Sequence, residues 1–112
     1  MSPLNFITRT APTGPVLEIA GDLDYAHAPQ LHAQLPGLDL RPGQRLVIDL
    51  AGMEFCDSTG ITALLAARNH AHAARADIAL AAVPAHTLRV LRVVGLDQVF
   101  AIHPDSGAAT RP

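Results

Sequence analysis

The chain has 112 residues, close to the common size of one domain, and its 49% apolar content is sufficient for a single hydrophobic core. Its eight basic side chains are all arginines, spread along the chain against ten acidic residues, so direct binding of nucleic acid is not expected at a net charge of −2. A single cysteine excludes an internal disulfide, no apolar run approaches the roughly 18 residues of a membrane span, and residues 1–10 lack a signal-peptide pattern, so we expect a cytoplasmic protein without membrane insertion.

The first part of the chain predicts a β-hairpin followed by a short helix. Residues 4–10 and residues 16–20 are apolar and partly β-branched, and the Pro-Thr-Gly-Pro segment between them is a turn signal. A helix is predicted over residues 26–35, where apolar side chains lie close to one face, and Pro36-Gly37 ends it. Asp24 precedes this helix and is expected to cap its free N–H groups.

The middle of the chain alternates strands and helices. Residues 46–50 form a short continuous apolar run, which is typical of an interior strand, and residues 51–60 are predicted to form a loop. A long helix follows, because apolar residues recur at helical spacing from Ile61 to Ala71 among many alanines. Residues 78–83 predict a further strand.

The last part predicts a helix, a strand and a tail. Pro84 begins a second amphipathic helix that ends at Gly95, and residues 99–102 make a final short strand. Residues 105–112 are small and polar without periodicity, so we expect a flexible tail after a single domain at residues 1–104. The order β-β-α-β-α-β-α-β predicts an α/β fold, a mixed sheet flanked by helices.

The segment Asp57-Ser58-Thr59-Gly60 places a carboxylate, two hydroxyls and a glycine at the entry of the long helix. Unpaired backbone N–H groups and the positive end of the helix dipole favour negative charge there, so a phosphate on Ser58 would be well accommodated. The purely structural interpretation is that Asp57 or Ser58 caps the helix. Gly60 costs roughly 1 kcal/mol relative to Ala in a helix interior, which indicates a close approach by either a partner or an internal strand.

Two further acidic residues, Asp22 and Asp24, follow the second predicted strand. In a sheet with crossovers they could end near the Ser58 loop and form a small acidic surface around its hydroxyl. Phosphorylation there would add nearly two negative charges, which would repel an acidic partner or remove its hydrogen bonds. The residues therefore indicate a surface that a phosphate can switch off.

Three segments resemble the corresponding motifs of STAS domains, and most of all those of stand-alone bacterial anti-sigma factor antagonists. They are Gly21-Asp22-Leu23-Asp24, Leu46-Val47-Ile48-Asp49-Leu50 and Met53-Glu54-Phe55-Cys56-Asp57-Ser58-Thr59-Gly60-Ile61. The similarity in spacing and element order extends from about Phe6 to Ile102. It implies a STAS-like mixed sheet flanked by helices. Family members commonly carry another helix after the last strand, and residues 105–112 lack a helical composition, so this helix is expected to be missing.

The resemblance also implies a mechanism. In the family, the serine that corresponds to Ser58 is phosphorylated by an anti-sigma factor that is itself an ATP-dependent serine kinase. The unphosphorylated antagonist binds this kinase and frees the sigma factor, and a cognate serine phosphatase resets the phosphorylated form. Ser58 would then be the phosphoacceptor, and the partner-binding residues would be Asp22, Asp24, Asp57, Thr59 and Gly60. Catalysis would belong to the partner, so neither enzymatic activity nor a cofactor is expected of this chain.

Two other functions remain open. Some STAS domains are non-switching accessory subunits of membrane transport ATPase complexes, which is the alternative for this chain.

An enzyme would need Cys56 as its nucleophile, but a lone cysteine is more often a small buried hydrophobe, and no evident base lies near it in sequence. The histidines do not converge, since His70 and His72 are two residues apart on a helix, and no metal site is expected.

Overall fold

A computed structural model describes residues 2–112. The order of the larger elements follows the predicted alternation, with short helical turns added. The strands are β1 (Asn5–Ala11), β2 (Gly14–Leu23), β3 (Arg45–Cys56), β4 (Asp77–Ala81) and β5 (Ala101–His103). The α-helices are α1 (Ala28–Gln34), α2 (Ser58–Ala73), α3 (Ala85–Val93) and α4 (Ser106–Ala109), and short 3-10 helices lie at Leu35–Gly37 and Leu96–Gln98.

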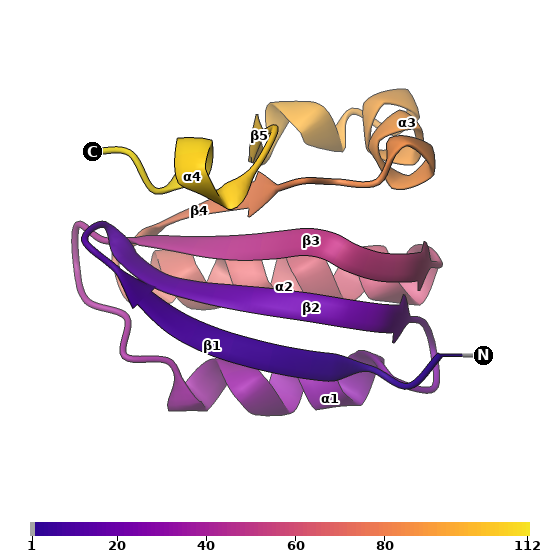
Figure 1. The fold of residues 1–112 in the computed structure, drawn as a ribbon, viewed down its shortest axis with the longest axis horizontal. Helices are drawn as coiled ribbons and strands as arrows, with labels where there is room; N and C mark the ends of the chain where they lie inside the picture. The colour runs from indigo at the N-terminus through magenta and orange to yellow at the C-terminus, as the bar shows by residue number, and fades with distance from the viewer. Residues whose placement is uncertain (1) are drawn as a thin grey trace.

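The five strands form one mixed sheet in the order β1-β2-β3-β4-β5. β1 and β2 pair antiparallel as a hairpin, and the three other neighbouring pairs are parallel. Figure 1 shows α1 and α2 behind the sheet, with the ends of β2 and β3 and the start of α2 at the same end of the molecule. The predicted α/β fold with a mixed, helix-flanked sheet is confirmed.

Most of the hydrophobic core lies between the sheet and helices α1, α2 and α3. Leu17, Ile48 and Leu80 from the sheet are fully buried there with Leu64 of α2 and Leu91 of α3. These residues alternate with others along their strands, because successive side chains of a strand point to opposite faces. The long helix α2 therefore packs on the sheet through its buried face, and its first turn lies at the ends of β2 and β3.

A smaller apolar cluster lies on the other face of the sheet. Val16, Val47, Ala79 and Ala81 are fully buried there and pack with Ala109 of α4. This packing differs from the loose tail expected for residues 105–112. The composition of residues 105–112 does not predict α4, because this helix is a single turn that is stabilised by tertiary contacts and by its cap.

Two polar groups hold that turn in place. The Asp105 carboxylate caps α4 by accepting from the Ala108 N–H at 2.8 Å. The Arg45 guanidinium donates from Nη1 to the carbonyl oxygens of Ala109 at 2.9 Å and Arg111 at 3.0 Å.

The largest local difference from prediction is in β3, which the structure continues through residues 51–56, where a loop was expected. The strand stays paired with β2, with Ala20 opposite Gly52 and Leu23 opposite Cys56, through two irregularities in register that each add one residue to β3. An extra residue of this kind bends a strand without ending it. The loop prediction was wrong because Gly52 and Glu54, residue types that are uncommon in strands, interrupt the continuous apolar run, and the pairing with β2 keeps the segment extended.

We expect Arg45→Met to loosen the α4 turn while leaving the sheet intact, because the two carbonyl bonds are lost and the alkyl stem is kept. Hydrogen exchange of the Ala109 and Thr110 amides should accelerate by about tenfold, corresponding to ~1.4 kcal/mol. Arg41→Met is the matched control, since Arg41 contacts only exposed Asp39 among the ion pairs of residues 2–112. Equal exchange in both variants would show that Arg45 does not hold the turn.

Candidate functional site

The site is built around the first turn of α2, which Asp57 caps. Asp57 has extended backbone angles, and its Oδ1 accepts from the Gly60 N–H at 2.9 Å. This satisfies one of the backbone donors that a helix leaves free at its start. Of the two residues predicted as possible caps, Asp57 is therefore the one that the structure selects.

The same carboxylate also reaches the segment before α1. Asp57 Oδ2 accepts from the Tyr25 N–H at 3.0 Å. The backbone of Asp57 adds a longer bond, from its N–H to the Leu23 carbonyl at 3.4 Å. One residue, through its side chain and its backbone, thus joins the end of β2, the turn that follows it and the first turn of α2.

Ser58 is the first residue of α2, and it is exposed. Its hydroxyl makes no hydrogen bond with any other residue of the range 2–112, while its carbonyl accepts from the Thr62 hydroxyl at 3.0 Å. Thr59 beside it is half-buried. Of the four motif residues, Ser58 is therefore the only exposed one.

Gly60 is buried against the chain's own second strand. A Cβ on Gly60 would lie 2.1 Å from the Leu23 carbonyl oxygen and 2.8 Å from the Cys56 sulfur. The first distance is far below any real contact with a backbone atom, so no larger residue fits without a shift. Of the two close approaches considered for Gly60, the internal strand is the one that occurs.

Asp22 near the end of β2 and Asp24 just after the strand do not form a continuous acidic surface with Ser58. Asp22 is 9% exposed, and its Oδ2 accepts from the Ser2 backbone N–H at 2.9 Å. Asp24 is half-buried and lies closer to α1, where its Oδ1 contacts both the backbone N–H of His27 at 3.0 Å and the His27 Nδ1 at 2.7 Å. Asp22 thus ties down the N-terminal segment, and Asp24 closes the turn before α1.

The prediction that Asp24 caps the helix is wrong in detail. The N-cap position belongs to His27, without a side-chain cap, because the bonds of Asp24 close the turn one residue earlier. Partial burial acts to raise the pKa of the Asp24 carboxyl, but the hydrogen bonds and charge of His27 outweigh it, and the pKa lies below its ordinary value. Asp24 therefore stays ionised beside the site.

Cys56 lies directly behind the motif and is mostly buried. Burial, with a smaller contribution from the Asp57 charge, raises the pKa of its thiol to about 12. Since the thiolate is the nucleophile, a thiol held protonated at neutral pH is a poor catalytic group. The structure supports the interpretation of Cys56 as a small buried hydrophobe.

Two shallow hollows flank the motif on the surface. One runs from Ser58 to α3 and is lined by Cys56, Asp57, Ser58, Ile61, Thr62, Val90 and Val94. The other runs from Thr59 to the start of α1 and is lined by Tyr25, Ala26, Ala28, Pro29, His32 and Thr59. The exposed Ser58 is thus one of the residues that line a mostly apolar hollow.

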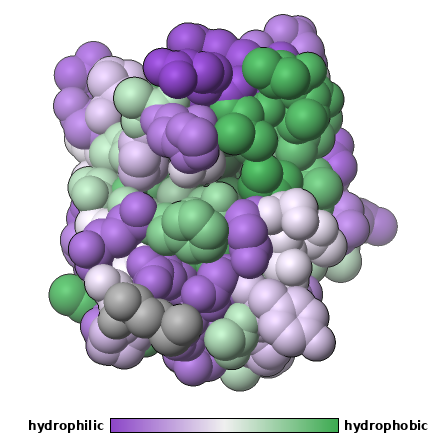
Figure 2. Space-filling view, turned by 90° about the vertical axis from the view of Figure 1, so that its right-hand side faces the viewer, coloured by the Kyte–Doolittle hydropathy of each residue, from purple (hydrophilic) through white to green (hydrophobic). Residues whose placement is uncertain are grey.

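The α3 side of this surface was missed by sequence reasoning. Val93 is 81% exposed and Val94 is 58% exposed, next to the hollow that Val90 lines. Figure 2 looks onto this end of the molecule and shows a continuous hydrophobic area in its upper part, at the height of α3. The spacing of these valines fits the helical period, so the sequence pattern alone would assign them to the buried face of α3. The structure shows instead that Val93 and Val94 face outward.

No three histidine, cysteine or acidic side chains gather within residues 2–112 to hold a metal ion. None of the helices in that range combines the length and apolar character needed to cross a bilayer.

Comparisons with known proteins agree with the fold. The protein-family model described as "Mlab, STAS domain" matches residues 7–103. An anti-sigma factor antagonist from Mycobacterium paratuberculosis is 25% identical, with a TM-score of 0.81 over 97% of this chain and 95% of that chain. A search of curated proteins gives no match.

Two more distant structures share the fold. The Bacillus cell fate determinant SpoIIAA in its phosphorylated form is 17% identical, with a TM-score of 0.68 over 94% of this chain and 96% of that chain. A sulfate transporter family protein from Wolinella succinogenes is 15% identical, with a TM-score of 0.76 over 91% of this chain and 85% of that chain.

We expect Gly60→Ala to destabilise the domain, because the added methyl group must displace the Leu23 carbonyl or the start of α2. The expected loss is about 1–3 kcal/mol in the free energy of unfolding, although Ala is the better helix former. Gly37→Ala is the matched control, since its Cβ would meet nothing within 4 Å. Chemical denaturation measures both. Equal stability of the two variants would contradict the close packing of Gly60.

Proposed function

Because this chain belongs to the STAS domain family, we propose that it is a cytoplasmic anti-sigma factor antagonist controlled by phosphorylation of Ser58. In the unphosphorylated state it binds an anti-sigma factor serine kinase and frees the sigma factor. The kinase then phosphorylates Ser58 and releases the antagonist, and a cognate serine phosphatase restores the first state. The chain itself performs no catalysis and needs no cofactor.

The observation that carries this proposal is the placement of the Ser58 side chain. Ser58 is an exposed residue at the start of a 16-residue helix, and its hydroxyl makes no hydrogen bond with any other described residue. A kinase can reach such a hydroxyl without unfolding the domain. The positive end of the helix dipole also accommodates the phosphate that results.

The apolar hollow beside Ser58 explains how a phosphate would break the complex. A partner seated on Val90 and Val94 would exclude water from the rim where Ser58 lies. A phosphoserine brings about −1.5 to −2 charges to that rim, close to the Asp57 carboxylate. Its desolvation, together with repulsion from any acidic group of the partner, would oppose binding.

The proposed partner contact uses the remaining predicted residues in different ways. Thr59 and Asp24 are half-buried at the surface and can touch the partner directly. Asp57 orients the loop through its bonds to the Tyr25 and Gly60 amides. Asp22 and Gly60 are buried, so they act on the contact only by shaping the strand end and the first turn.

A second candidate function is that of a non-switching accessory subunit of a membrane transport ATPase complex. The fold shared with the sulfate transporter family protein from Wolinella succinogenes keeps this candidate open. In this case the same end of the domain would hold its partner permanently, and a phosphate on Ser58 would have no regulatory role.

The test is a pull-down from the native cells with wild type, Ser58→Ala and Ser58→Asp as baits and identification of the bound proteins by mass spectrometry. The proposal predicts a serine kinase on wild type and Ser58→Ala, and at least about tenfold less of it on Ser58→Asp. Thr10→Asp is the control, because it adds the same charge to an exposed position of β1 far from the motif.

Retention of one transport ATPase by all four baits would favour the accessory-subunit function instead. Absence of any kinase from the wild-type bait would contradict the proposal. Circular dichroism of each bait confirms that the substitutions leave the fold intact.

We further expect Val94→Ser to weaken binding of the captured partner without changing the stability of the domain. Val94 is 58% exposed and lines the hollow beside Ser58, so its methyl groups are buried only in the complex. Val99→Ser is the matched control, because Val99 is partly exposed but lies outside that hollow. Titration calorimetry with the partner measures both. Equal affinities would place the contact away from α3.

A further inference from the structure

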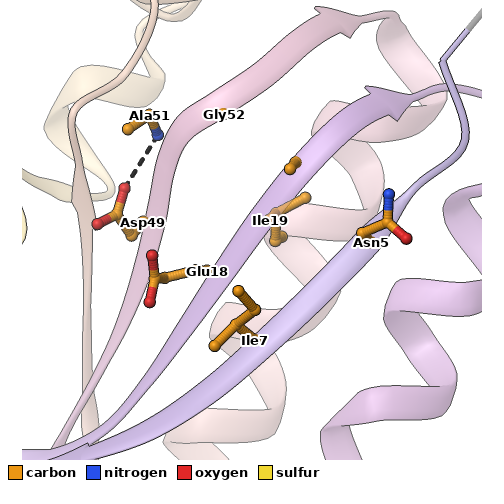
Figure 3. A pocket seen from close by; sticks show the side chains of 8 residues that line it. Asn5, Ile7, Glu18, Ile19, Asp49, Ala51 and Gly52 are labelled. Carbon is orange, nitrogen blue, oxygen red and sulfur yellow. Dashed lines mark hydrogen bonds between the residues drawn. The ribbon is translucent and has the colours of Figure 1, made fainter.

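The face of the sheet opposite α1 and α2 is only partly covered. α4 packs on the cluster around Val47 and leaves the other end of this face open. There Ile7 is 63% exposed, and Ala20, Ala51 and Gly52 are also exposed. These residues surround a small hollow of about 120 Å³ across β1, β2 and β3, which Figure 3 shows from close by.

Two carboxylates lie side by side at this hollow. Glu18 of β2 and Asp49 of β3 are direct neighbours in the parallel pairing of the two strands, and both line the hollow. Like charges directly opposite each other destabilise a sheet. A cation between or beside the two groups would remove that repulsion.

Of the two carboxylates, only that of Glu18 forms an ion pair within residues 2–112. Glu18 accepts from the Arg9 Nε at 3.2 Å, and the Arg9 guanidinium also donates to the Ser106 hydroxyl at 2.7 Å. Asp49 is 9% exposed, and none of the ion pairs within residues 2–112 includes it. A largely buried carboxylate without a cation is costly.

The backbone of β3 fixes the position of the Asp49 carboxylate. Between the pairs Glu18–Asp49 and Ala20–Gly52, β3 contains one residue more than β2, which is a bulge. The bulge brings the Ala51 N–H to 2.9 Å from Asp49 Oδ1. The carboxylate is therefore held at the hollow by the strand itself.

We propose that this hollow is a docking site for a lysine or arginine side chain of a partner protein. The alkyl stem would pack on Ile7, Ala20 and Ala51, and the cationic head would pair with Asp49 and Glu18. The charge of the two carboxylates and the apolar lining fit an organic cation. A bare metal ion is disfavoured, because residues 2–112 gather no third ligand of the usual kinds there.

This docking site is separate from the Ser58 surface and does not rest on the proposed function. The hollow lies on the open face of the sheet, whereas α2 covers the opposite face and Ser58 lies at its start. A partner bound through the hollow would stay bound whether or not Ser58 carries a phosphate. The domain would then connect two proteins, only one of them under the control of phosphorylation.

The test uses n-butylguanidinium, which mimics an arginine side chain, and its uncharged analogue n-butylurea. Each is titrated into isotopically labelled protein, and amide chemical shifts are followed by NMR. The proposal predicts saturable shifts at Ile7, Ala20, Ala51 and Gly52 with the cation and at least about tenfold weaker binding of the urea.

Asp49→Asn should weaken binding of the cation at least about tenfold while keeping the fold, because the amide oxygen can still accept from the Ala51 N–H. Asp77→Asn is the matched control, since Asp77 is an exposed aspartate at the start of β4, outside the hollow. Glu18→Gln is a second variant at the hollow, to be used if Asp49→Asn does not fold, and it should also weaken binding.

Three results would overturn the proposal. They are shifts that do not saturate, equal binding of the cation and the urea, and an affinity for the cation that neither Asp49→Asn nor Glu18→Gln lowers relative to Asp77→Asn.

Discussion

The structure of the site depends on one carboxylate. Asp57 accepts from the Gly60 N–H with one oxygen and from the Tyr25 N–H with the other. These two bonds join the turn after β2 to the first turn of α2, and the missing side chain of Gly60 lets the helix approach the Leu23 carbonyl. Ser58 lies between Asp57 and Gly60 and takes part in none of this packing. The groups that hold the loop are therefore distinct from the group that we propose to be modified, and a phosphate can be added without dismantling the fold.

Two surfaces with different chemistry follow from this arrangement. The end of the molecule around Ser58 combines a free hydroxyl with an apolar hollow and the exposed valines of α3, a combination that a phosphate changes strongly. The open face of the sheet combines two neighbouring carboxylates with a small apolar hollow, and within residues 2–112 only Glu18 of the two forms an ion pair. The first surface suits a contact that is switched, and the second suits one that persists.

The parts of the fold with strong local signals could be predicted from the sequence. The hairpin, the long alanine-rich helix and a cap at Asp57 or Ser58 each depend on neighbouring residues, and the structure has all three, with Asp57 as the cap. The continuation of β3 through residues 51–56 and the α4 turn depend on pairing and packing with distant segments, which periodicity does not show. The burial of Asp22 has the same origin, since its partner is the backbone of Ser2. The outward face of α3 could not be separated from core, because the buried Leu91 and the exposed Val93 lie only two residues apart on one short apolar helix.

The most direct test of the account is to purify the protein from its native cells under several growth and stress conditions and to locate any phosphate by peptide mass spectrometry. The account predicts a phosphate on Ser58 whose occupancy changes with conditions, and none on Thr59 or Thr62. A protein that carries no phosphate under any condition, or carries it only at another residue, would contradict the central claim.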